Sequence, residues 1–176
     1  VGFAWSINPY RGCEFGCHYC YARYTHEYME LRESRHFEQK IYAKTRAAEL
    51  LRQELRRNPQ GEIALGTSTD PYQPAERRYC VTRKILEVFA AERGRRLAIT
   101  TKGDLIVRDI DLLRDVARSN VLHISVTVTT TDEKLARKLE PRAPRPHLRL
   151  AAVARLAAAG LSVGVNVMPI LPGITD

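Results

Sequence analysis

Long apolar runs are absent from this sequence of 176 residues. No run approaches the roughly 20 apolar residues that a membrane-spanning helix needs, so we expect no membrane association. Cysteines are few, and three of the four lie close together near the start of the chain. Clustered cysteines argue against a secreted disulfide scaffold and favour a reducing compartment. Because the first residues also show no signal-peptide pattern, we expect a cytoplasmic protein.

Hydrophobic residues make up 44% of the chain, which favours a folded core over intrinsic disorder. The length suits one domain. The formal net charge is +8, from 28 basic and 20 acidic residues. A basic excess can attract nucleic acid or another polyanion, although a soluble arginine-rich enzyme would carry the same charge. Val1 is not an initiator methionine and the chain stops just after a strand-like run, so we expect a fragment or a trimmed core.

Cys13, Cys17 and Cys20 have the spacing C-x3-C-x2-C. Thiols this close cannot all pair with one another, and no distant cysteine cluster could pair with them. They can instead converge on one metal centre, because Gly12 and Gly16 allow the loop to wrap around it. Soft thiolates select zinc, copper(I) or an iron–sulfur cluster. A structural zinc site wants four ligands, whereas a [4Fe–4S] cluster held by three cysteines keeps one iron open.

Short apolar segments alternate with helical patterns along the chain. We expect strands at residues 2–8, 62–66, 96–101, 121–128 and 161–168. Helices are expected at 43–57, from a cap at Thr82 to Gly94, at 109–119, from Thr131 to Glu140 and at 148–159. Such alternation predicts an α/β fold with a parallel sheet and outer helices, curled by right-handed crossovers into part of a barrel. Five strands are too few for a closed eight-stranded barrel.

Polar residues follow the predicted strands at the carboxyl ends, where reactive groups collect in parallel α/β folds. Besides the cysteine loop, these residues are Ser68, Thr69, Asp70, Lys102 and Ser125. Each also has a simpler interpretation. The stretch from Ser68 to Asp70 suits a turn, Lys102 could be a solvated loop lysine, and the Ser125 hydroxyl could bond to backbone.

The cysteine spacing, with Tyr19 in the aromatic position before the last cysteine, resembles the cluster loop of radical S-adenosylmethionine (radical SAM) enzymes. Other stretches resemble the spore photoproduct lyase-like branch, within an uncharacterised bacterial subgroup. They are Asn8-Pro9-Tyr10, Cys20-Tyr21-Ala22-Arg23, the run from Thr69 to Glu76, Thr101-Lys102, the run from Arg108 to Leu113 and Leu139-Glu140-Pro141-Arg142. The resemblance covers nearly the whole chain. It implies a partial (β/α)6 TIM-like barrel, with residues 1–176 as its core domain and a sixth strand beyond Asp176.

The resemblance also implies an activity and two cofactors. A [4Fe–4S] cluster on the three clustered cysteines and S-adenosylmethionine (SAM) would yield a 5′-deoxyadenosyl radical that abstracts hydrogen from a substrate. The SAM amino group would lie near Ser68 or Asp70, its carboxylate at Lys102, its ribose at Ser125 and its adenine against Tyr19. The implied partners are a reductant such as flavodoxin or ferredoxin and a nucleic-acid substrate.

The sequence departs from the spore photoproduct lyase pattern at one position, and this limits what the resemblance implies about the substrate. Spore photoproduct lyases carry a hydrogen-donor cysteine in the loop after the second strand, where this sequence has Thr67-Ser68. Cys80 lies further along, and we expect it to be a lone buried thiol. Repair of a thymine dimer adduct therefore does not follow from the resemblance. The sequence is also compatible with a second class of protein, a zinc-stabilised nucleic-acid-binding module with His18 as the fourth zinc ligand.

Overall fold

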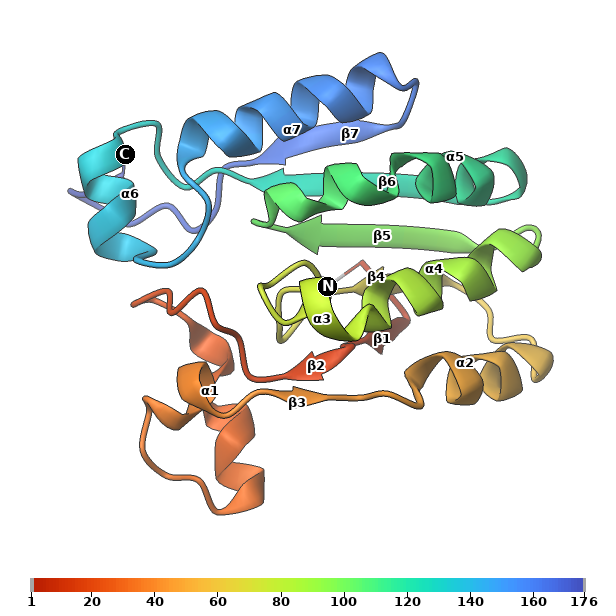
Figure 1. The fold of residues 1–176 in the computed structure, drawn as a ribbon, viewed down its shortest axis with the longest axis horizontal. Coiled ribbons are helices and arrows are strands. Elements are labelled where there is room, and N and C mark those ends of the chain that lie inside the picture. The colour runs from red at the N-terminus through yellow and green to blue at the C-terminus, as the bar shows by residue number, and fades with distance from the viewer. Residues whose placement is uncertain (1, 176) are drawn as a thin grey trace.

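The structure, a computed structural model, describes residues 2–175 and is built around a five-stranded parallel sheet (Figure 1). The sheet order is β1-β4-β5-β6-β7, and every neighbouring pair is parallel. The strands are β1 (Trp5–Ile7), β4 (Glu62–Leu65), β5 (Arg96–Thr101), β6 (Val121–Thr127) and β7 (Val163–Asn166). The predicted α/β class and parallel sheet are confirmed, and the sheet is open, as in a partial barrel.

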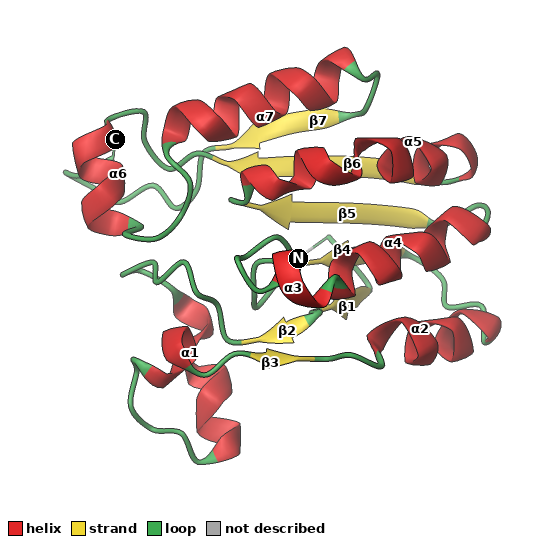
Figure 2. Ribbon diagram, viewed as in Figure 1, coloured by secondary structure: helices red, strands yellow, loops and turns green. Residues whose placement is uncertain are grey.

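Helices cover one face of this sheet, because each strand lies next to its predecessor and right-handed crossovers place every connecting helix on the same side (Figure 2). The covering helices are α2 (Ala47–Arg56), α4 (Val81–Ala91), α5 (Ile110–Ser119) and α7 (Pro146–Ala158). The core lies between the two layers and contains fully buried side chains such as Ile85, Phe89, Ile99, Leu113 and Ile124.

The opposite face of the sheet carries small and polar side chains. On β5, Leu97 and Ile99 are buried under the helices, whereas the alternate residue Ala98 is half-buried and Thr100 is exposed. Ser125 of β6 pairs in register with Thr100 of β5 on one side and with Gly164 of β7 on the other. Side chains alternate between the two faces of a strand, so these residues line the uncovered face.

The segment before α2 is the main departure from the predicted elements. Instead of a helix at 43–57, β3 (Tyr42–Ala43) pairs antiparallel with β2 (Tyr10–Arg11), and α2 begins only at Ala47. Two-residue strands are too short to show a period, which is why the sequence pattern misses them. Between these two strands lie two helical segments, η1 (Tyr21–Met29) and α1 (His36–Gln39).

The start of α4 corrects the predicted Thr82 cap. Thr82 lies inside α4, and its hydroxyl donates to the carbonyl of Pro71 at 2.5 Å. The first turn is capped by Glu76 of α3 (Glu76–Tyr79), whose carboxylate accepts from the backbone N–H groups of Thr82 at 2.9 Å and Arg83 at 3.1 Å. A carboxylate suits this end of a helix because of the partial positive charge there.

The remaining helices lie close to their predicted places. The predicted helix at 109–119 is preceded by a 3-10 turn, η2 (Asp104–Asp109), before α5 begins. Asp132 caps α6 (Glu133–Leu139) by accepting from the backbone of Lys134 and Leu135. Helix α7 starts at Pro146, earlier than expected, because Pro is favoured in the first helical turn. No helix among residues 2–175 is long and apolar enough to span a membrane.

Candidate metal and cofactor site

The cysteine loop follows β2 and gathers its thiols in one small apolar cluster. Phe15, Cys17 and Ala143 form the buried part, and Cys13, Tyr19 and Cys20 pack against it. All three cysteines are free thiols.

Two glycines let the loop wrap tightly. Gly12 has φ of +83°, and a Cβ there would lie 2.7 Å from the carbonyl oxygen of Phe37. Gly16 has φ of +67°, and a Cβ there would lie 2.8 Å from Nη2 of Arg142. Because these positions need both a left-handed backbone and no side chain, any other residue would strain the loop.

The segment from Thr69 to Ala75, which follows β4, holds the first part of the cysteine loop at Gly12 and Glu14. Thr69 Oγ1 donates to the Gly12 carbonyl at 2.6 Å, and Gln73 Nε2 donates to the same oxygen at 3.1 Å. The Glu14 carboxylate accepts from the backbone of Ala75 at 2.6 Å. Thr69 and Gln73 are both buried, so these polar contacts are shielded from water.

The segment Leu139-Glu140-Pro141-Arg142, here called the 139–142 strap, holds the cysteine loop at Phe15 and His18. The backbone N–H of His18 donates to the Leu139 carbonyl at 2.9 Å, and that of Arg142 donates to Phe15 at 3.2 Å. Arg142 also reaches Glu38 at 3.0 Å. Two segments far apart in sequence therefore hold the loop between them.

The donor set fits an iron–sulfur cluster. No set of three or more His, Cys, Asp or Glu side chains among residues 2–175 is already arranged to hold a metal ion. The three thiols nevertheless share one apolar cluster, and they are soft donors of the type that iron–sulfur clusters use. Burial raises the pKa of Cys13 and raises that of Cys17 to about 11, so a metal would have to displace protons on binding.

Asp70 connects the loop after β4 to the end of β5. Its Oδ1 accepts from the Thr101 hydroxyl at 2.6 Å and from the Tyr72 backbone at 2.9 Å, and its Oδ2 accepts from the Lys102 backbone at 2.7 Å. Burial raises the pKa of Asp70, although these three donors oppose the shift. The carboxylate thereby fixes the main chain at Lys102.

Lys102 extends from the end of β5 toward the aromatic residue of the cysteine loop. Its Nζ lies 5.6 Å from the ring centroid of Tyr19 and 3.9 Å from Oε1 of Glu140. The positive charge of Lys102 lowers the pKa of Cys17, opposing the larger effect of burial. The structure thus brings together Lys102, Tyr19 and the thiols, which the sequence placed at separate strand ends.

The Tyr19 hydroxyl contacts two residues, Glu140 and Thr129, to which the sequence assigned no role in the site. It donates to Glu140 and lies 3.0 Å from Oγ1 of Thr129. Burial is the main cause of its raised pKa, with the charges of Cys17 and Glu140 adding to the effect. The one signal in the sequence that could have pointed to Glu140 is the resemblance of the 139–142 strap to the spore photoproduct lyase-like branch.

Comparison with known proteins decides the family. A family model described as the radical SAM superfamily matches residues 7–176. The chain belongs to the radical SAM superfamily. The expected family is therefore confirmed.

Relatives with similar sequences occur in distant organisms. An uncharacterized protein of Mycobacterium tuberculosis is 42% identical over 176 residues, covering 99% of this chain and 52% of the relative. An uncharacterized protein of Acidianus two-tailed virus is 33% identical over 177 residues, covering 96% of this chain and 56% of the relative. This radical SAM chain thus spans about half the length of the curated relatives that it matches.

Solved structures confirm the likeness of fold to spore photoproduct lyase. A variant of that enzyme with bound AdoMet and a dinucleoside spore photoproduct gives a TM-score of 0.68 at 20% identity, covering 93% of this chain and 45% of the other. Streptococcus suis SuiB bound to S-adenosylmethionine gives 0.58 at 16% identity, covering 92% and 31%. At these identities the likeness concerns the fold.

Ser68 and Ser125, the other residues predicted for the radical SAM site, are not part of the apolar cluster that holds the thiols. Ser68 is half-buried, and its backbone N–H donates to the Asn8 side chain at 2.8 Å. Ser125 is half-buried on the uncovered face of β6. Their roles at the SAM amino group and at the ribose stay predictions.

Two further expectations concern His18 and Cys80. The His18 side chain is exposed, so the structure offers no support for it as a zinc ligand. Cys80 was expected to be buried, and this is wrong. It is partly exposed just before α4, with φ of +50° and its Sγ 3.9 Å from Nη1 of Arg108. The chain turns sharply between α3 and α4 at this residue, which lifts the thiol out of the core.

Proposed function

We propose that this protein is a radical SAM enzyme in which Cys13, Cys17 and Cys20 hold a [4Fe–4S] cluster. When bound, the cluster and SAM supply a 5′-deoxyadenosyl radical that abstracts hydrogen from a substrate. The observation that supports this most directly is the gathering of three free thiols in one loop of a radical SAM domain. The loop is pinned by hydrogen bonds from two other segments, which favours a defined site over a solvated turn.

The chain's own residues would bind and orient the cofactor. Lys102 would attract the SAM carboxylate, because its ammonium group is held near Tyr19 with its side chain only 17% exposed. Tyr19 would line the adenine and Ser125 would bond to the ribose. Ser68 and Asp70 would accept from the amino group, with Asp70 also fixing the Lys102 backbone.

The proposed partners are an electron donor such as flavodoxin or ferredoxin and a nucleic-acid substrate. The net charge of +8 supports a polyanionic substrate. A related fold is seen in spore photoproduct lyase with a dinucleoside spore photoproduct. Thr67-Ser68 offers no thiol as a hydrogen donor, so a lyase reaction of that kind is not proposed. We place the protein in the cytoplasm, where the thiols would stay reduced.

Anaerobic reconstitution with iron and sulfide tests the proposal. We expect about four irons per chain, an EPR signal on reduction, and release of 5′-deoxyadenosine from SAM in the presence of a reductant. Cys17→Ala should abolish all three, whereas Cys80→Ala, the matched control outside the loop, should abolish none. One zinc per chain with no iron after this treatment would instead support the zinc-stabilised module and refute the enzyme.

A further inference from the structure

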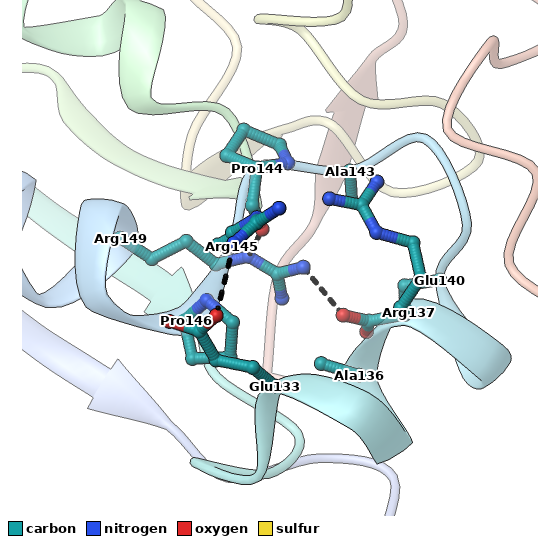
Figure 3. Close-up of a pocket in the computed structure, with 9 residues that line it drawn as sticks. All are labelled: Glu133, Ala136, Arg137, Glu140, Ala143, Pro144, Arg145, Pro146 and Arg149. Carbon is teal, nitrogen blue, oxygen red and sulfur yellow. Dashed lines mark hydrogen bonds and ion pairs between the residues drawn. The ribbon is translucent and has the colours of Figure 1, made fainter.

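Glu140 is a buried acid in the middle of the 139–142 strap. Only 2% of the residue is exposed, so its charge must be compensated by neighbours. Arg149 of α7 supplies the compensation, since its Nη2 lies 2.5 Å from Oε2 of Glu140 and the residue is itself 1% exposed. Figure 3 shows this pair beside a cavity of about 10 Å³, which is room for about one water molecule.

The other oxygen of Glu140 faces the cysteine loop. Oε1 accepts from the Tyr19 hydroxyl and from Oγ1 of Thr129 at 2.8 Å, and it lies 3.9 Å from Nζ of Lys102. One carboxylate therefore has a structural partner on one side and two proposed cofactor-binding residues on the other. Arg149 is further held by the Pro144 carbonyl at 2.7 Å and the Thr127 carbonyl at 3.1 Å, so it gives Glu140 a fixed position.

The separation between Lys102 and Glu140 is itself informative. At 3.9 Å the two groups attract each other, but the distance is too long for a hydrogen bond. The ammonium group thus stays oriented by charge, and it donates no hydrogen bond to an acceptor among residues 2–175, which leaves its N–H groups available to a ligand. An incoming carboxylate could bind Lys102 without first breaking a hydrogen bond to Glu140.

We propose that Glu140 is a positioning residue that holds Lys102 and Tyr19 in the arrangement that receives SAM, with Arg149 anchoring Glu140 from behind. This inference rests on the proposed function, because the ligand that Lys102 receives is the SAM carboxylate. Asp70 fixes the Lys102 backbone, and Glu140 fixes the charged end of the side chain.

The variant Glu140→Gln keeps an acceptor for Tyr19 but removes the charge that orients Lys102. Glu133→Gln is the matched control, because Glu133 lies on α6 beside the same cavity but pairs with the exposed groups of Arg145 and His147. Since Glu140→Gln leaves Arg149 as an unpaired buried charge, Glu140→Gln combined with Arg149→Met removes both charges and guards against misfolding.

The first measurement uses the metal-free protein. Amine-reactive labelling, read by mass spectrometry, should modify Lys102 several-fold faster in both Glu140 variants than in wild type or Glu133→Gln. Without the carboxylate charge, the Lys102 side chain is released from its mostly buried position beside Glu140 and Tyr19 and becomes more accessible to the reagent. Equal labelling of Lys102 in all four proteins would overturn the proposal.

The second measurement uses reconstituted protein. The Kd for SAM should rise roughly five- to tenfold in the Glu140 variants, as for loss of a partly buried ion pair, with iron content unchanged. Unchanged or tighter SAM binding would overturn the positioning role. Failure of wild type itself to take up iron or bind SAM would overturn the proposed function, and the labelling result distinguishes the two.

Discussion

Replacing Glu76 by alanine would remove a buried carboxylate that joins the strand before the cysteine loop to two helices. Glu76 has no exposed surface. Its Oε2 accepts from the Tyr10 hydroxyl at 2.5 Å and its Oε1 accepts from Arg108 Nη2 at 3.0 Å. The same carboxylate caps α4 through the two backbone N–H groups described above. Alanine would therefore remove one acceptor from each of these four donors.

The expected loss of stability follows from these contacts. Breaking a buried ion pair by removing one partner costs about 3–5 kcal/mol. Asp109 still binds Arg108 at 2.8 Å, which limits the penalty on that arginine, but the cap and the Tyr10 bond are lost as well. We therefore expect Glu76→Ala to lower the free energy of unfolding by about 3–5 kcal/mol. That is a large share of the total of about 5–15 kcal/mol for a typical domain.

Urea unfolding of the metal-free protein, followed by circular dichroism, measures this change. Glu87→Ala is the control, because the Glu87 side chain is 50% exposed and lies 3.8 Å from Arg83. Its free energy of unfolding should fall by less than about 1 kcal/mol. If both variants lose the same stability, the Glu76 network is not a buried cap and the reasoning fails.

Three further variants test single features of the site and its surroundings. Gly16→Ala should destabilise the metal-free protein more than Gly94→Ala, since both glycines have positive φ but only Gly16 has neighbours within 4 Å of a new Cβ; equal shifts in Tm would contradict the predicted clash. Lys102→Ala should weaken SAM binding while iron content stays at the wild-type value, so a parallel loss of iron would count against its assignment. The pKa of Asp132 is lowered by the backbone N–H groups of Leu135 and Lys134, so its cap stabilises α6 above the unfolded pKa of 3.8 and loses that effect as pH falls through the lower folded pKa. The Tm difference between wild type and Asp132→Ala should therefore shrink below pH 3.8, and a constant difference from neutral to acid pH would refute the cap.

The sheet and the cysteine loop could be predicted because their signals are local. Strand β5 matches its predicted bounds, since alternating apolar residues lie between charged and glycine-containing turns. The cysteine loop can be recognised from the C-x3-C-x2-C spacing of its cysteines. Lys102 could be placed near the site because the ends of parallel strands meet at one edge of the sheet.

The contacts that support the site depend on distant parts of the chain and leave little trace in the local pattern. The sequence pattern suggests that Glu140 and Arg149 are ordinary surface charges on helical stretches. Both are nevertheless buried, because they pair with each other and Arg149 also donates to the Thr127 and Pro144 carbonyls. Glu76 caps a helix other than its own, so no cap pattern at Thr82 could reveal it. Only tertiary packing shows which charged residues are buried.

The position of the 139–142 strap has a consequence for the order of events during synthesis. A ribosome releases the N-terminal part of a chain first, so Cys13, Cys17 and Cys20 emerge long before Arg142. The hydrogen bonds that join the strap to His18 and Phe15 can form only once the chain as far as Arg142 is outside the ribosome. We therefore expect the three thiols to leave the ribosome unconfined and to need protection from oxidation or stray metals until the 139–142 strap packs against their loop. Under the proposed function, iron and sulfide would find the cysteine loop held on both sides only after the chain as far as Arg142 has emerged.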